Sequence, residues 1–137
     1  MPLLSWSDKF AIGLPLIDEQ HRRLFDLTNN LYDCVQTDSS KGAVSDAIAA
    51  LIDYTQYHFK AEEDYMFNVE YTRFEQHKLA HDNLTQQALD FKAKFQKEEG
   101  DTGEFIKFLF DWLTKHIMDQ DKKIGKFMEM KLLKPIL

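Results

Sequence analysis

The sequence contains few of the residues that interrupt helices. Only five glycines and three prolines occur among 137 residues, and none of them lies inside four long stretches of helical periodicity. This scarcity favours long helices over many short strands. The single cysteine, Cys34, excludes a disulfide within the chain and fits a reducing cytoplasm.

Two further absences concern partners and location. The net charge is −6 with acidic and basic residues interspersed, so the chain lacks the basic surface expected of a nucleic-acid-binding protein. No secretory leader opens the sequence, and no apolar run is long enough to cross a bilayer. We therefore expect a cytoplasmic protein with no nucleic-acid partner and no membrane segment.

Apolar and aromatic side chains are abundant, and their spacing is helical. Hydrophobic residues make up 44% of the chain, including eleven Phe, five Tyr and two Trp, which suits one domain with a substantial core. Apolar and histidine side chains recur every three or four residues over 18–36, 43–65, 73–97 and 104–119. The connections between these stretches are short, which predicts an all-α fold, an antiparallel up-down-up-down four-helix bundle.

The beginning of the chain shows no sustained period. Residues 1–17 predict an irregular N-terminal arm whose Trp6, Phe10 and Ile12 pack onto the bundle. Asp18 is expected to cap the first helix, because an aspartate side chain can accept hydrogen bonds from the free N–H groups of the first turn.

The end of the chain is also less regular than the bundle. Residues 122–137 predict a C-terminal tail with a short helix that is interrupted at Gly125. Together with a bundle over 18–121, the arm and the tail would make residues 1–137 a single domain.

All five histidines lie on the inward faces of the predicted helices: His21, His58, His77, His81 and His116. One such histidine alone is more often a hydrogen-bonded core residue than a metal ligand. Five of them, with Glu62 on the same face as His58, would each need a partner that the apolar stripes do not offer. Because successive helices alternate in direction, all five should meet at one end of the bundle. Imidazole and carboxylate are natural ligands of transition metals, so a metal site would satisfy them together.

The number of ligands favours two metal ions over one. Five histidines, a bridging Glu62, a second bridging carboxylate and a bridging oxo or hydroxo group fill all but one of the roughly twelve positions of two octahedral ions. Asp121 is a candidate for the second carboxylate, although it follows His116 by five residues, the wrong spacing for one face of an α-helix. We therefore predict that the helix ends or bulges near 118–120, with Asp119 as the rival candidate. Five apolar side chains are expected around the site: Phe25, Phe59, Trp112, Leu113 and Ile117.

Four segments resemble the ligand motifs of the bacterial hemerythrins. They are "DEQH" (18–21), "HFKAEE" (58–63), "HKLAH" (77–81) and "WLTKHIMDQD" (112–121). The resemblance covers nearly the whole chain and implies a non-haem centre of two Fe ions with an oxo or hydroxo bridge. Its ligands would be His77, His81 and His116 on one iron, His21 and His58 on the other, and Glu62 and Asp121 as bridges.

The resemblance also implies reversible O₂ binding at the iron with two histidines, which agrees with the one open position in the ligand count. Such a protein would be an oxygen carrier, store or O₂-sensing domain rather than an enzyme. Its partners would be O₂, small anions such as azide, and a delivery partner or a fused signalling domain. Two alternatives stay open: a di-iron oxidase or peroxidase that uses the open position, and a metal-independent helical interaction domain.

Overall fold

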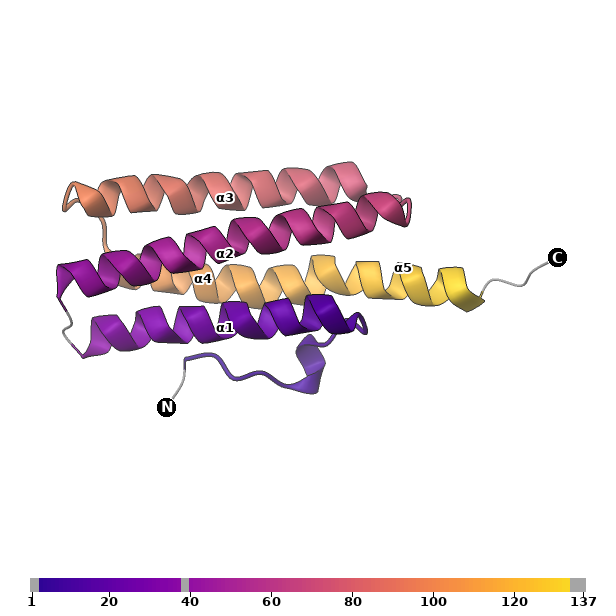
Figure 1. The fold of residues 1–137 in the computed structure, drawn as a ribbon, viewed down its shortest axis with the longest axis horizontal. Coiled ribbons are helices and arrows are strands. Elements are labelled where there is room, and N and C mark those ends of the chain that lie inside the picture. Colours follow the sequence, from indigo (N-terminus) through magenta and orange to yellow (C-terminus); the bar gives the residue numbers. More distant parts are fainter. Residues whose placement is uncertain (1–2, 38–39, 134–137) are drawn as a thin grey trace.

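Helices make up most of the chain. The computed structural model describes residues 3–37 and 40–133, so the predictions for 1–2, 38–39 and 134–137 lie outside the described residues. The elements follow in the order η1 (Asp8–Phe10), α1 (Pro15–Gln36), α2 (Lys41–Asn68), α3 (Phe74–Gln96), α4 (Thr102–His116), η2 (Ile117–Asp121) and α5 (Lys122–Leu133). Helices α1 to α4 lie side by side with alternating direction, and no strand occurs in the described residues (Figure 1). The predicted all-α four-helix bundle is confirmed.

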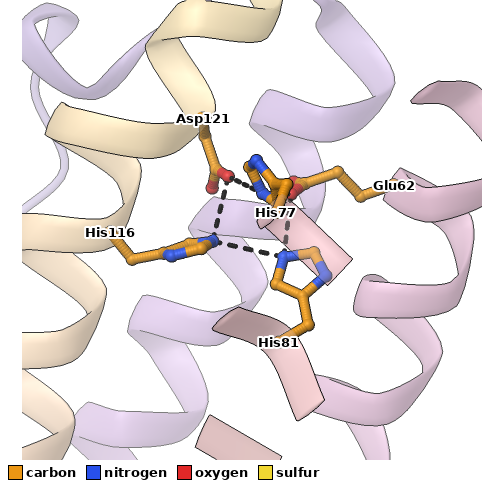
Figure 2. Close-up of side chains that lie close together, drawn as sticks. All are labelled: Glu62, His77, His81, His116 and Asp121. Carbon is orange, nitrogen blue, oxygen red and sulfur yellow. Dashed lines mark hydrogen bonds and ion pairs between the residues drawn. The ribbon is translucent and has the colours of Figure 1, made fainter. Parts of the chain in front are cut away.

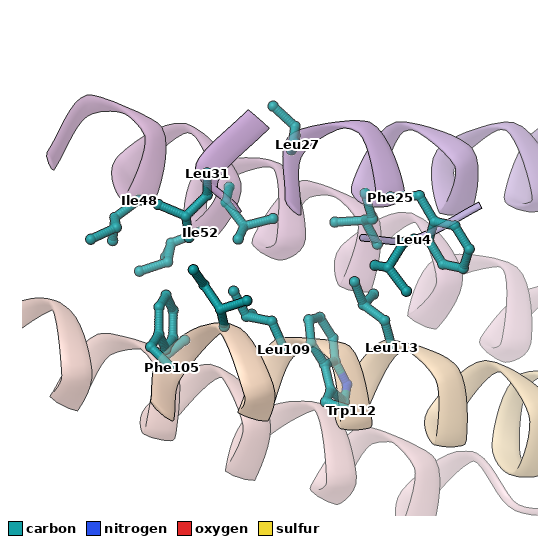
Figure 3. Close-up of a cluster of buried hydrophobic side chains, with 14 of the residues drawn as sticks. Leu4, Phe25, Leu27, Leu31, Ile48, Ile52, Phe105, Leu109, Trp112 and Leu113 are labelled. Atoms are coloured by element: carbon teal, nitrogen blue, oxygen red, sulfur yellow. The ribbon is translucent and has the colours of Figure 1, made fainter. Parts of the chain in front are cut away.

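Apolar side chains from all four bundle helices and from the arm form the main core, part of which is drawn in Figure 3. Its most buried members include Phe25, Leu31, Ile48, Leu51, Leu109 and Leu113. A fully buried side chain of this size contributes about 1.5–3 kcal/mol, so this core holds the helices in a fixed arrangement around the polar end of the bundle. None of the described helices is both long and apolar enough to span a membrane.

Helix α1 begins earlier than predicted, and Asp18 does not cap it. Its first residue is Pro15, which suits this position because a proline has no N–H group to leave without a partner. The carboxylate of Asp18 instead accepts hydrogen bonds from the backbone N–H groups of Ile12, at 2.8 Å, and Gly13, at 3.2 Å. The prediction of an Asp18 cap was wrong because this side chain bonds to the arm rather than to the helix.

The N-terminal arm packs along α1, as predicted. Phe10 and Ile12 are buried, and Trp6 is half-buried against Phe10 and Phe25, with ring centroids 5.8 and 5.3 Å apart. Asn29 fixes the start of the arm through two 2.8 Å hydrogen bonds, one from the N–H of Leu4 and one to its carbonyl. The arm is therefore part of the folded structure.

Helix α5 continues through Gly125 without a break, which corrects the predicted interruption. A glycine stands at this position because α5 lies against the arm: a Cβ atom on Gly125 would be 2.0 Å from the carbonyl oxygen of Ile12. The glycine therefore serves packing. Helix α5 also buries Ile124 against Met66 and Tyr71, a small group that we call the second core.

Helices α2 and α3 end in the same way. Glu70 and Glu98 have positive φ angles, 58° and 61°, in the left-handed region that glycine usually occupies after a helix. The N–H of the next residue reaches back five residues in each case, from Tyr71 to the carbonyl of Met66 and from Glu99 to that of Lys94. These turns reverse the chain within a few residues.

The predicted bulge near 118–120 is confirmed. Residues Ile117–Asp121 form the π-helical turn η2 between α4 and α5, and the N–H of Lys122 donates to the carbonyl of Ile117, five residues earlier. A turn closed by bonds between residues five apart brings such residues to about the same side of the helix. His116 and Asp121 can therefore face one site.

Candidate metal centre

Seven buried polar side chains meet at one end of the bundle, and they are the seven predicted from the sequence. Each of them is at most 8% exposed: His21 from α1, His58 and Glu62 from α2, His77 and His81 from α3, His116 from α4 and Asp121 from η2. The helical spacing of four residues places His58 beside Glu62, and His77 beside His81, on one face of each helix. The Nε2 atom of every histidine lies within 3.5 Å of at least one of the two carboxylates, and those of His21 and His77 lie close to both.

Glu62 divides its two oxygens between two groups of histidines. Its Oε1 atom lies 2.7 Å from His77 Nε2 and 3.1 Å from His81 Nε2. Its Oε2 atom lies 3.2 Å from His58 Nε2 and 3.5 Å from His21 Nε2. The glutamate thus stands between α3 on one side and α1 on the other.

Asp121 also divides its oxygens between the two groups, and Figure 2 shows it beside His77 and His116. Its Oδ1 atom lies 2.9 Å from His77 Nε2 and 3.1 Å from His116 Nε2, whereas its Oδ2 atom lies 2.9 Å from His21 Nε2. Asp119, the rival candidate, is exposed to solvent. The structure therefore brings Asp121, and not Asp119, to the histidines.

The donor atoms fall into two overlapping groups, each of which could hold a metal ion. One group contains Glu62, His77, His81, His116 and Asp121, and the other contains His21, His58, Glu62 and Asp121. Within each group, the ligand atoms lie within 4.8 Å of one another. Both carboxylates belong to both groups, which is the arrangement that two bridged ions need.

Burial and mutual attraction compete in the protonation of this site. Burial lowers the pKa of His21 and of His77, but Asp121 and Glu62 outweigh it and raise both pKa values to about 9. Burial would raise the pKa of Asp121, and Glu62 would raise it too, yet His116 and His21 hold that pKa below its usual range. For His58, burial outweighs the attraction of Glu62 and lowers the pKa. Without metal, protons on some of the histidines balance the two buried carboxylates.

Several buried atoms of the site form no well-aligned hydrogen bond among the described residues, although Nε2 of His21 and the carboxylate oxygens concerned lie 2.9–3.5 Å from an ion-pair partner. They are Nδ1 and Nε2 of His21, Oε2 of Glu62 and both carboxylate oxygens of Asp121. Buried polar atoms without a partner are costly, and in native proteins they are rare. Nitrogen and carboxylate oxygen atoms in this number suit first-row transition metals, so the donor set fits such ions.

Aromatic rings cover one side of the site. The Phe59 ring stacks on His81, with centroids 3.8 Å apart and planes 5° from parallel, and Trp112 packs edge-on against Phe59 at 5.6 Å. Both residues were predicted to lie near the site, and the contacts confirm this. The other three predicted residues, Phe25, Leu113 and Ile117, are buried in the main core.

Two residues beside the ligand positions were not singled out from the sequence. Gln20 Oε1 lies 2.7 Å from His58 Nδ1, and Glu63 Oε2 lies 2.9 Å from His81 Nδ1. Both directly adjoin a predicted ligand in the sequence, Gln20 before His21 and Glu63 after Glu62, so they lie off the inward stripe of their helix. A search for polar residues next to each ligand could have found them.

The fold and the site define a class: helical-bundle proteins with a candidate two-metal centre. The sequence model described as "Hemerythrin HHE cation binding domain" matches residues 13–127. The chain therefore belongs to the hemerythrin family, which confirms the resemblance seen in its motifs.

Individual proteins support this assignment. The chain is 35% identical over 127 residues to the bacteriohemerythrin of Methylococcus capsulatus, covering 91% of this chain and 96% of that protein. It is 34% identical over 122 residues to the bacteriohemerythrin of Stenotrophomonas maltophilia, covering 89% of this chain and 79% of that protein. A crystal structure of wild-type hemerythrin superposes with a TM-score of 0.86 at 34% identity, covering 90% of this chain and 96% of the other.

Proposed function

We propose that this protein binds O₂ reversibly at a centre of two iron ions. Hemerythrins bind non-haem iron, and the fold and the family are consistent with O₂ binding at a di-iron centre. The observation that carries the proposal is the division of Glu62 and Asp121, each of which presents one oxygen to either group of histidines.

In this proposal, the ligands are shared unequally between the two ions. His77, His81 and His116 would hold one iron, and His21 and His58 would hold the other. Glu62, Asp121 and an oxo or hydroxo group would bridge them. Three histidines and three bridges would complete an octahedral ion, whereas two histidines and three bridges would leave one position open. O₂, or a small anion such as azide, would take that position.

When bound, two ferrous ions would supply the electrons for reversible O₂ binding. The residues of the chain would fix these ions from α1 to α4 and η2 and keep bulk water away, since all seven side chains are buried. Five of the seven ligands are neutral imidazoles. Neutral ligands stabilise highly oxidised iron less than carboxylates do, so the site favours binding of O₂ over cleavage of its bond.

The site suits binding better than turnover. An oxidase or peroxidase is not favoured, because the relatives are named bacteriohemerythrins and the fold is that of hemerythrin. A carrier, a store and an O₂-sensing domain share this site chemistry. A delivery partner or a fused signalling domain would give it one of these roles. We also propose that the arm, the bundle and α5 form one unit.

The test is metal analysis combined with optical spectra. Purified protein loaded with Fe(II) without air should hold two irons per chain, and its spectrum should change on exposure to O₂ and return under vacuum. One metal ion per chain at full loading would contradict the two-iron centre. Irreversible oxidation in every cycle would instead favour an oxidase.

A further inference from the structure

Two histidines of the centre have a hydrogen-bond partner on the side away from it. All five histidines direct Nε2 toward the carboxylates, which leaves Nδ1 free for an outer contact. The Nδ1 atom of His58 lies 2.7 Å from Oε1 of Gln20, and that of His81 lies 2.9 Å from Oε2 of Glu63. Each contact joins neighbouring helices, α1 to α2 and α2 to α3.

The donor in both contacts follows from metal binding. A histidine that binds a metal through Nε2 carries its proton on Nδ1, because the metal needs the lone pair of Nε2. The Nδ1–H group therefore donates to the amide oxygen of Gln20 in one case and to the carboxylate of Glu63 in the other. Both contacts fix the orientation of an imidazole ring toward its metal.

The two acceptors differ in charge. A carboxylate attracts the Nδ1 proton more strongly than a neutral amide oxygen does, because hydrogen bonds to an ionised group are about twice as strong. The ring that donates to a carboxylate becomes a more basic ligand and gives more electron density to its metal. A more electron-rich ion holds the ferric state more firmly. His81 has the carboxylate, and His58 has the amide.

We propose that Gln20 and Glu63 are positioning residues that make the two ions unequal in electron supply. This rests on the proposed function, in which His58 belongs to the iron that takes O₂ and His81 to its neighbour. The neutral Gln20 keeps the O₂-binding ion in the ferrous state that it needs for reversible uptake. The anionic Glu63, whose side chain is only 18% exposed, supports the iron that has no open position.

Two isosteric exchanges test this inference. Gln20→Glu places a carboxylate behind His58, and Glu63→Gln removes one from behind His81. Midpoint potentials are measured by optical titration with redox mediators on the iron-loaded proteins. Gln20→Glu should lower the potential and Glu63→Gln should raise it, with two irons per chain in both. The double variant has the net charge of the original chain but reversed acceptors, and its O₂ cycles should end sooner in irreversible oxidation.

Matched controls separate the hydrogen bond from the added charge. Gln56→Glu adds a carboxylate at an exposed position two residues from His58, and Asp64→Asn removes one beside Glu63 from an exposed pair with Lys60. Neither should shift the potential as the exchanges do. Equal shifts in the controls, or no shift in the exchanges, would overturn the inference.

A second measurement tests the role of Gln20 if the Gln20→Glu variant binds iron poorly. If Gln20→Glu holds fewer than two irons, Gln20→Met replaces it, since methionine offers only a weak acceptor and adds no charge. The Nδ1–H proton of His58 should then exchange faster with solvent in nuclear magnetic resonance spectra. An unchanged exchange rate would overturn the role of Gln20. Failure of the original chain to bind two irons would instead contradict the proposed function itself.

Discussion

Gly125 of α5 lies directly against the carbonyl group of Ile12 in the arm, where a Cβ atom would come within 2.0 Å of the oxygen. At a solvent-exposed position inside a helix, replacing glycine by alanine stabilises the protein by about 1 kcal/mol. At Gly125 we expect the free energy of unfolding to change in the opposite direction. Gly125→Ala should destabilise the protein by about 1–3 kcal/mol, because the added methyl group must push backbone apart.

Urea unfolding of the iron-loaded proteins, followed by circular dichroism, measures this effect. Gly42→Ala is the matched control, since the nearest atom to its Cβ would be Ser40 Oγ at 3.9 Å. This control should be neutral or slightly stabilising. Equal effects of the two substitutions would show that the Ile12 contact does not constrain α5.

A second prediction separates the two aspartates of η2. Asp121→Asn keeps the size of the side chain but removes the charge that faces His21, His77 and His116, so iron affinity should fall at least about tenfold. Asp119→Asn should leave it unchanged, because Asp119 is exposed. Iron content after dialysis against a weak chelator measures this. Full iron content in Asp121→Asn would mean that another carboxylate bridges the ions.

A third prediction concerns pH. In the metal-free protein, burial lowers the pKa of His21 and His77, but the carboxylates raise both from 6.5 to about 9. A raised pKa in the folded state contributes stability that is complete below pH 6.5 and lost as the pH rises through about 9. The lowered pKa of Asp121 contributes stability that is lost in acid. The metal-free protein should therefore resist urea best in mildly acidic solution.

Iron binding should show the reverse trend above pH 6.5. Both histidines must lose a proton to bind metal, so affinity should rise with pH by up to about a hundredfold per unit until about pH 9. Chelator competition at several pH values measures this rise. An affinity independent of pH would show that neither histidine is protonated in the metal-free site.

A fourth prediction concerns the turn after α2. Glu70 is exposed and holds a φ of 58°, a conformation that costs a side-chain-bearing residue roughly 1 kcal/mol or more. Glu70→Gly should therefore stabilise the protein by about 0.5–1 kcal/mol in urea unfolding. Glu75→Gly, in the first turn of α3, should destabilise it by a similar amount. A destabilised Glu70→Gly protein would contradict the strain at this position.

The features that could be predicted from the sequence are those set by the helical spacing of residues. The helices and the five inward histidines follow from spacings of three and four residues, which are local properties. Asp121 could be found because its spacing from His116 did not fit an α-helix and required a bulge. In these cases the chain alone carries the signal.

The errors and omissions have a different origin. Asp18 bonds to the arm and Gly125 packs on it, so both depend on contacts that no spacing within a helix reveals. Gln20 and Glu63 were overlooked because each meets a histidine of another helix. Tertiary contacts, rather than local propensity, decided all four positions.

The π-helical turn η2 also determines which side of α5 faces the bundle. One additional residue rotates α5 by about 100° relative to a straight continuation of α4. A heptad frame carried across residues 117–121 would therefore assign the wrong face to Ile124, which is fully buried against Met66 and Tyr71. Deleting one residue there would straighten the helix but would turn Asp121 and Ile124 away from their partners together. The number of residues in η2 therefore sets the orientation of Asp121 in the metal centre and of Ile124 in the second core. A change in that number would displace both.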